Sequence, residues 1–223
     1  MLIHPWDAVI DDDEWRLWLD RGHDFGQLAV NGEVGKPPLV LPIHFVREGE
    51  TLLIHLARPN PVWEAIEADP NVLMAVVDDY AYIPTMWRAK SEGRPQEGVP
   101  TSYYSAVQFS CRAELVDDPE AKADLLRRQL AHFQPEGDHA EVAVDQAPYG
   151  PMLSGIRGAI LHVETVVAKF KYDDHRPTDV REQVSRRLDD RATGRDASAA
   201  VQQRRRLERL GTWRERIPPS QGP

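Results

Sequence analysis

Alternating apolar and polar positions dominate the first three quarters of the chain, and this pattern predicts β-strands. The strand-like segments are rich in β-branched residues and are bounded by Gly, Pro, Asn or Asp. Gly49 lies in a short loop typical of a hairpin, and the first three segments are expected to be consecutive antiparallel strands. The pattern predicts strands at residues 25–31, 37–48, 51–57, 71–83, 102–118 and 159–173.

Helical periodicity and capping signals predict helices between and after these strands. Acidic residues at 11–13 precede an apolar run, and Asn60 with Pro61 supplies an N-cap and a first helical position. Thr178 is predicted to cap a later helix. The helices are predicted at residues 15–19, 61–69, 119–133, 178–191 and 196–210.

This order of elements predicts a mainly β fold with flanking helices. Strands that are mostly connected by hairpins do not fit a parallel βαβ sheet, but they fit an antiparallel barrel with helices packed on its outside. The sequence contains no Gly-rich phosphate loop. We predict a barrel domain over residues 1–176 and a C-terminal helical extension over residues 177–223.

Composition and charge argue against a nucleic-acid-binding protein, a disulfide-bonded protein and a membrane-spanning protein. There are 36 acidic and 27 basic residues, a net charge of −9, which disfavours direct nucleic-acid binding. The basic run Arg204–Arg216 is an exception, and we expect it to be a solvated helix face. A single cysteine, Cys111, cannot form an internal disulfide, and no apolar run approaches the ~20 residues that span a bilayer. A cytoplasmic protein without a membrane segment is expected.

Two common kinds of catalytic site lack their sequence signals. His44 and His55 lie on predicted neighbouring strands and could approach each other, but there is no H-E-x-x-H, no cysteine pair and no cluster with ligand spacing, so no metal site is predicted. Ser154 lacks the G-x-S-x-G motif, and Cys111 has no His nearby in sequence. We therefore set a metalloenzyme and a hydrolase aside.

The end of the third predicted strand is a candidate anion site. His55 and Arg58 are followed by a helix start with free backbone N–H groups, and this combination favours phosphate. Pairing of Arg58 with a surface acid such as Glu64 is an equally good interpretation.

The long segment 81–107 is the second candidate site. Flat aromatic rings beside cations suit an extended heteroaromatic ligand that carries a phosphate, and they suit a subunit interface equally well. The residues concerned are Tyr82, Trp87, Arg88, Lys90, Thr101, Tyr103 and Tyr104.

Four segments, in order, resemble the PaiB-type family of FMN-binding negative transcriptional regulators. "IHLARPNPVW" is similar to the family's G-H-x-A-R-x-N-P-x-W, and "AYIPTMWRAK…GVPTSYY" to its A-Y-I-S-P-x-W-Y…V-P-T-W-N-Y. "LSGIRGAILHVETVVAKFKYDDHRP" resembles its C-terminal L-x-x-I-x-G…K-x-K-x-S-Q-N-R-P, and "HDFGQLAV" its H-P-F-A-x-L-V. The resemblance runs from about residue 1 to residue 190.

The resemblance implies a split β-barrel like that of pyridoxamine-phosphate oxidases, a homodimer with FMN at the subunit interface. By matched position it places His55, Arg58 and Asn60 near the ribityl phosphate. It places further residues around the flavin or the dimer seam, namely Tyr82, Trp87, Lys90, Thr101, Lys169 and Lys171.

The chain also departs from the family pattern. Asp79 and Tyr80 stand where the family tends to have Gly, and Asp173 and Asp174 bring negative charge to a neutral position, where they would repel a nearby phosphate by ~1 kcal/mol per exposed pair. Other departures are Pro84, Arg88, Ser102, Tyr103 and His175.

The favoured function is an FMN-binding split-barrel homodimer with a flavin-dependent redox or regulatory role. If the protein is an enzyme, it is a flavin-dependent oxidoreductase, because the flavin supplies the chemistry. The alternative is a barrel scaffold that has lost FMN and acts as a regulatory or interaction protein. Haem binding through His55 or His175 is the third hypothesis.

Overall fold

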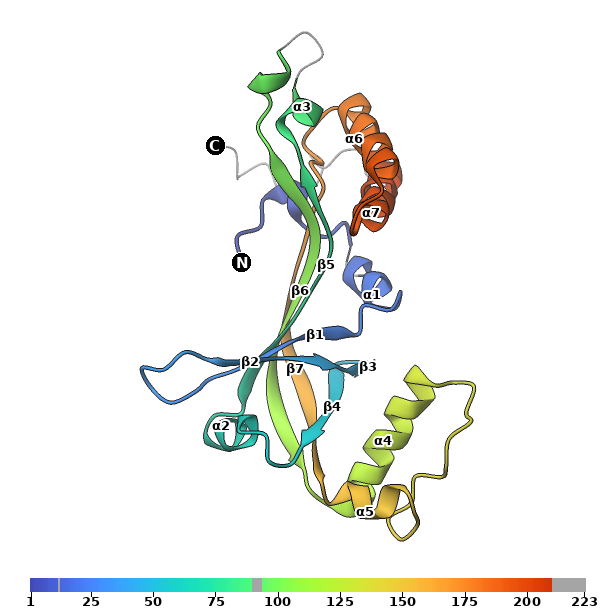
Figure 1. The fold of residues 1–223 in the computed structure, drawn as a ribbon. Helices are drawn as coiled ribbons and strands as arrows, with labels where there is room; N and C mark the ends of the chain where they lie inside the picture. Colours follow the sequence, from blue (N-terminus) through green and yellow to red (C-terminus); the bar gives the residue numbers. More distant parts are fainter. Residues whose placement is uncertain (12, 90–93, 210–223) are drawn as a thin grey trace. The chain divides into compact units, whose positions relative to one another are not determined.

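The computed structural model describes residues 1–11, 13–89 and 94–209. Seven strands form one antiparallel sheet in the order β2-β1-β5-β6-β7-β4-β3, and helices flank it (Figure 1). The strands are β1 (Phe25–Val30), β2 (Leu39–His44), β3 (Val46–Glu48), β4 (Thr51–Ala57), β5 (Asn71–Ile83), β6 (Thr101–Val116) and β7 (Ile156–Lys171). The sheet is open, with β2 and β3 at its ends, and the prediction of a split barrel is confirmed.

The first strands pair as two separate hairpins. β1 pairs with β2, and β3 pairs with β4, whose other neighbour is β7. The expected antiparallel pairing of the first three predicted strands is therefore confirmed, but the second of them, 37–48, is divided into β2 and β3, which lie at opposite ends of the strand order. The predicted strand 37–48 is interrupted at Phe45, whose side chain is buried and whose backbone N–H donates to Asp24 O at 2.9 Å. This bond holds the chain at the break between the two hairpins.

All five predicted helices are present, and the described residues contain four shorter ones that are too short to show a helical period. Thr178 does not cap α6: it is the first helical residue, Pro177 is at the N-cap, and no side chain caps this end. The helical elements are η1 (Pro5–Asp7), α1 (Glu14–Leu19), α2 (Val62–Ala68), α3 (Thr85–Arg88), η2 (Pro95–Glu97), α4 (Pro119–Phe133), α5 (Tyr149–Leu153), α6 (Thr178–Arg191) and α7 (Asp196–Arg209).

The chain divides into two compact units. The first contains residues 1–21, 77–107 and 167–223, and the second contains residues 22–76 and 108–166. α6 and α7 lie side by side in the first unit (Figure 1). The predicted boundary at residue 176 stays a prediction.

In the second unit, α4 packs against β3, β4 and β6. Asp118 caps this helix by accepting from the backbone N–H of Ala121 at 2.9 Å. Leu125 packs with Leu53 and Val116 in one apolar cluster, and a neighbouring cluster joins α4 to α5. This packing brings the first turn of α4 and the end of α5 together.

The described part of the basic run on α7 is a solvated face only in part. Arg206 is fully buried, and only 14 % of the Arg205 side chain is exposed. Both arginines donate to Glu14. Arg204 pairs with Asp189 at 2.7 Å on the surface. The expectation is wrong for Arg205 and Arg206, because α7 turns these two side chains toward a buried carboxylate of the same unit. Residues 210–216 lie outside the described residues.

Candidate functional site

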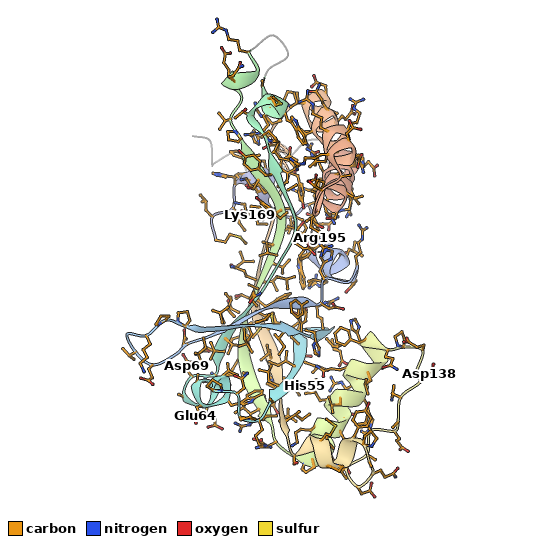
Figure 2. The ribbon with its side chains drawn as sticks, in the orientation of Figure 1. His55, Glu64, Asp69, Asp138, Lys169 and Arg195 are labelled. Atoms are coloured by element: carbon orange, nitrogen blue, oxygen red, sulfur yellow. The ribbon has the colours of Figure 1, made fainter. Side chains whose placement is uncertain are left out.

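The residues predicted to bind a cofactor fall in both units. His55, Arg58 and Asn60 belong to the second unit. Figure 2 labels His55 on β4 and Lys169 on β7. Lys90 lies outside the described residues, and the members of the first unit are Tyr82, Trp87, Thr101, Lys169 and Lys171.

The turn between β4 and α2 is held by its own polar groups. Asn60 accepts from the backbone N–H of Val62 at 3.1 Å through Oδ1 and from that of Trp63 at 3.3 Å through its carbonyl oxygen. The Trp63 indole donates to Ala57 O at 3.0 Å. Asn60 lies one position before the N-cap of α2, which is Pro61 and not Asn60 as predicted, and α2 begins at Val62. Two of the N–H groups expected to cradle an anion are already bonded to Asn60.

Arg58 pairs with an acid, which is Asp117 and not Glu64. Its Nη2 lies 3.3 Å from Asp117 Oδ1, and its Nε donates to Ser154 O at 3.1 Å. The side chain is 47 % exposed, and a guanidinium has five N–H donors, so these two contacts leave three donors for a ligand. Arg58 is anchored and still able to bind an anion.

Asp117 is shared between two guanidinium groups. Arg157 donates to its Oδ2 from Nη2 at 2.6 Å and from Nε at 3.0 Å. These bonds, together with the charge of Arg58, hold the pKa of Asp117 below its ordinary value. One carboxylate therefore faces two guanidinium groups, so the positive charge of Arg58 is only partly neutralised.

Arg58 lies at a pocket of about 400 Å³ in the second unit. The wall combines two cations and one acid with apolar groups. Lining residues come from the turn after β4, the start of α4, the loop before α5 and the end of α5, and they are Arg58, Asp117, Pro119, Lys122, Val144, Gly150, Leu153 and Ser154.

His55 is oriented by a side chain of α4. Its Nδ1 lies 2.6 Å from Gln129 Oε1, and Gln129 Nε2 donates to Leu53 O at 3.1 Å. Because the amide nitrogen is engaged with a carbonyl, Oε1 faces the ring and Nδ1 carries the proton. Burial lowers the pKa of His55, and its ring centroid lies 5.6 Å from that of His44. The predicted approach of these two histidines is confirmed.

Sequence patterns missed the polar partners on α4. Lys122 and Gln129 are buried although both residue types favour the surface. They stand three residues before and four after Leu125, which puts all three on one helical face. That spacing is the signal that could have found them.

In the first unit, the aromatic residues of the long segment lie beside α6. Arg191 packs over the Trp87 ring at 4.7 Å and donates to Tyr82 O at 2.9 Å. The Tyr82 side chain is exposed, as are those of Tyr80 and Met86. The rings thus present an apolar surface, with Trp87 already in contact with a cation.

Lys169 and Lys171 flank the ring of Tyr104, at 5.8 and 5.7 Å from its centroid. Lys169 is buried, donates to Leu2 O at 2.9 Å and lies 3.5 Å from Asp7. Burial lowers the pKa of Lys171. The K-x-K segment therefore sits against the N-terminal residues.

The departures from the family pattern compensate one another in the first unit. Arg88 donates to both carboxylate oxygens of Asp173, at 2.7 and 3.0 Å, and Tyr103 donates to the same group at 3.2 Å. Asp174 pairs with Arg181 and Arg206. Asp173 and Asp174 were expected to repel a nearby phosphate. This expectation is corrected, because arginines pair with both carboxylates.

The backbone conformation of Asp79 gives a reason for the glycine in the family pattern. Its φ of 57° lies in the left-handed region, which glycine and, less easily, aspartate adopt. Its carboxylate accepts from the Trp18 indole at 2.7 Å and from Ser105 Oγ at 3.1 Å. The substitution thus adds a buried polar contact to the first unit.

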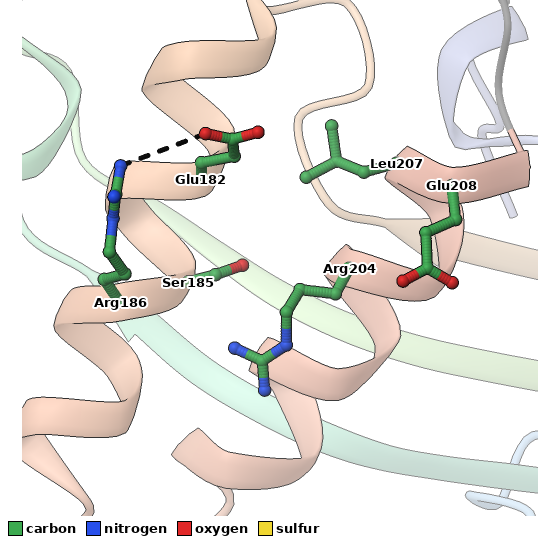
Figure 3. Close-up of a pocket in the computed structure, with 6 residues that line it drawn as sticks. All are labelled: Glu182, Ser185, Arg186, Arg204, Leu207 and Glu208. Atoms are coloured by element: carbon green, nitrogen blue, oxygen red, sulfur yellow. Dashed lines mark ion pairs between the residues drawn. The ribbon is translucent and has the colours of Figure 1, made fainter.

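A second pocket, of about 330 Å³, lies between α6 and α7 (Figure 3). Its walls carry both signs of charge, including an ion pair between Arg186 and Glu182. No group of three metal-ligating side chains occurs within the described ranges. None of the described helices is long and apolar enough to cross a membrane.

Comparison with known proteins agrees with this architecture. The flavocytochrome Anf3 of Azotobacter vinelandii superposes with a TM-score of 0.58, at 19% identity over 74% of this chain and 70% of that one. An FAD and heme binding protein of Mycobacterium smegmatis gives a TM-score of 0.50, at 18% identity over 68% and 70%. At these identities the likeness concerns the fold alone.

Sequence comparison identifies the family. Residues 1–165 match the model described as "Putative FMN-binding domain". The protease synthase and sporulation protein PAI 2 of Bacillus subtilis (strain 168) is 30% identical over 159 residues, which are 69% of this chain and 73% of that protein. The chain belongs to this PaiB-type FMN-binding family, as the four sequence motifs indicated.

Proposed function

We propose that this protein uses Arg58 to hold the phosphate group of FMN. The observation that carries the proposal is an anchored guanidinium with three unused donors at the edge of a 400 Å³ pocket. A planar guanidinium binds phosphate in two-point fashion. His55, held by Gln129, and Asn60 are assigned to the same phosphate region by the family motif.

The flavin ring is proposed to contact residues of the long segment and the K-x-K segment. Exposed Tyr82 and the partly buried Trp87 supply flat apolar surface, and Lys169 and Lys171 supply positive charge. The same exposed aromatics support a homodimer. Residues assigned to the ring or the dimer seam are Tyr82, Trp87, Lys90, Thr101, Lys169 and Lys171.

We infer a flavin-dependent redox or regulatory role. Bound FMN supplies hydride or electron transfer, while the protein binds and orients it. The alternative is a barrel that has lost FMN and regulates through a partner protein. It is favoured by the use of Arg88 and Tyr103 in buried contacts that leave them less free for a ligand.

The test is titration of the purified protein with FMN, followed by its visible spectrum and its sedimentation mass. We expect a flavin spectrum and the mass of a dimer. Arg58→Ala should weaken FMN binding about tenfold or more, because a charge-assisted phosphate contact is lost. Arg186→Ala is the control, since Arg186 is an exposed arginine of α6. A protein that ignores added FMN would support the alternative, and a Soret band would support haem binding.

A further inference from the structure

A buried lysine forms the inner wall of the pocket beside Arg58. Lys122, in the first turn of α4, is only 3% exposed. Its Nζ donates to the carbonyl oxygens of Leu153 and Ile156, the latter at 3.3 Å. An ammonium group has three N–H donors. One donor therefore remains, on a side chain that lines the pocket.

The charge of Lys122 lacks a close counter-ion. In the described part of the chain, no carboxylate lies within ion-pair distance of its Nζ, and its two partners are neutral carbonyls. Burial, and then the positive charge of Arg58, lowers its pKa. The one acid in the pocket wall, Asp117, is already shared by Arg58 and Arg157. A buried cation in this setting is stabilised by a bound anion.

Apolar groups make up part of the remaining pocket wall. Val144, Leu153 and Pro119 contribute hydrocarbon surface. Gly150 has no room for a side chain, because a Cβ there would lie 2.6 Å from Val144 O. The loop before α5 is therefore packed closely against the first turn of α5 at this edge of the pocket.

We propose that Lys122 is a second phosphate-binding residue, and that a phosphate monoester enters this pocket and accepts hydrogen bonds from Lys122 and Arg58. This inference rests on the proposed function in one respect, namely that the monoester is FMN. Lys122 lies 64 positions beyond Arg58 in the sequence, outside the four family motifs noted above. Its role follows from the packing of α4 against α5.

The test compares FMN with riboflavin, which differs only by lacking the phosphate. Lys122→Gln removes the charge and keeps N–H donors for the two carbonyls. We expect it to weaken FMN binding about tenfold and to leave riboflavin binding within about twofold, whereas Lys122→Arg should retain most of the preference for FMN. Lys36→Gln, an exposed lysine of the same unit that pairs with Glu33, is the control. An unchanged ratio of FMN to riboflavin affinity in Lys122→Gln overturns the inference.

Two further measurements separate this inference from the proposed function. If Lys122→Gln does not fold, Val144→Glu places a negative charge in the pocket from the opposite loop; loss of the FMN preference supports the site, and an unchanged preference contradicts it. If neither flavin binds the wild type, stabilisation against heat by inorganic phosphate is measured. Stabilisation that Lys122→Gln abolishes keeps the anion site and removes the FMN assignment, and its absence in the wild type removes both.

Discussion

At the scale of single residues, the arginines of α7 divide into two kinds. Arg206 is fully buried: its Nη1 donates to both oxygens of Glu14, at 2.7 and 2.8 Å, and its Nε donates to Asp174 at 2.7 Å. Arg204, two residues earlier, is 41% exposed and pairs with Asp189. The same residue type thus serves a buried ion network in one place and a surface pair in the other.

This difference predicts different costs of substitution. Arg206→Met should lower the free energy of unfolding by about 3–5 kcal/mol, because it removes one of the two arginine partners of each of two buried carboxylates, Glu14 and Asp174. Arg204→Met should change it by about 0–1 kcal/mol, since an exposed pair is screened by water. Urea unfolding measured for both variants checks this, and equal losses would show that Arg206 is not the centre of the network.

At the scale of elements, local patterns were sufficient for most of the fold. The β alternation and the turn signals Asn60 and Pro61 located strands and helices because their causes lie within a few residues. The break at Phe45 was not predictable, because it depends on a backbone bond to Asp24 across the β1–β2 hairpin. Short helices such as α3 and α5 have too few residues for a helical period.

The candidate site was predictable in part. Arg58 was found because the strand end and helix start are encoded side by side, but its partner Asp117 is 59 residues away. Lys122 was missed because its burial comes from the packing of α4 on α5. Local patterns name the residue that carries a charge, and tertiary packing decides which residues surround it.

Polar contacts of Asp196 hold the corner between α6 and α7, which is the turn that joins the two helices. Asp196 accepts from both the backbone N–H and the hydroxyl of Thr193 at 3.0 Å, and Arg191 donates to both of its oxygens. The hydrogen bond from Arg191 is the largest cause of the lowered pKa of Asp196. The ionised form of this carboxylate therefore stabilises the corner.

The pH dependence of this corner follows from that pKa. Because the pKa is lower in the folded protein, the stabilisation is fully present above the ordinary value of 3.8 and is lost as the pH falls through the lowered value. Asp196→Asn should cost about 1–3 kcal/mol at pH 7, and the difference from wild type should shrink near pH 3. Urea unfolding at both pH values tests this, with exposed Asp190→Asn as the control. A difference that does not change with pH would contradict the assignment.

At the scale of the whole molecule, charge argues against direct contact with DNA. The net charge is −9, and the protein would repel a phosphate backbone. The described arginines of the basic run are also engaged within the protein: Arg204 with Asp189, Arg205 and Arg206 with Glu14, and Arg209 with Asp11. An arginine that is paired with a carboxylate in this way is less available to bind a DNA phosphate.

We therefore expect no shift of duplex DNA by the purified protein in gel-shift titrations at about 150 mM salt, where non-specific affinities are weak. Substituting the whole run would confuse binding with folding, because Arg206 is buried. The informative variants are Arg204→Ala and Arg209→Ala, whose side chains are each 41% exposed. A wild-type shift that persists at this salt concentration and is abolished in these two variants would place DNA on α7 and overturn the argument from charge. An absent shift in a preparation that binds FMN would direct the search for a regulatory role to the flavin and to partner proteins.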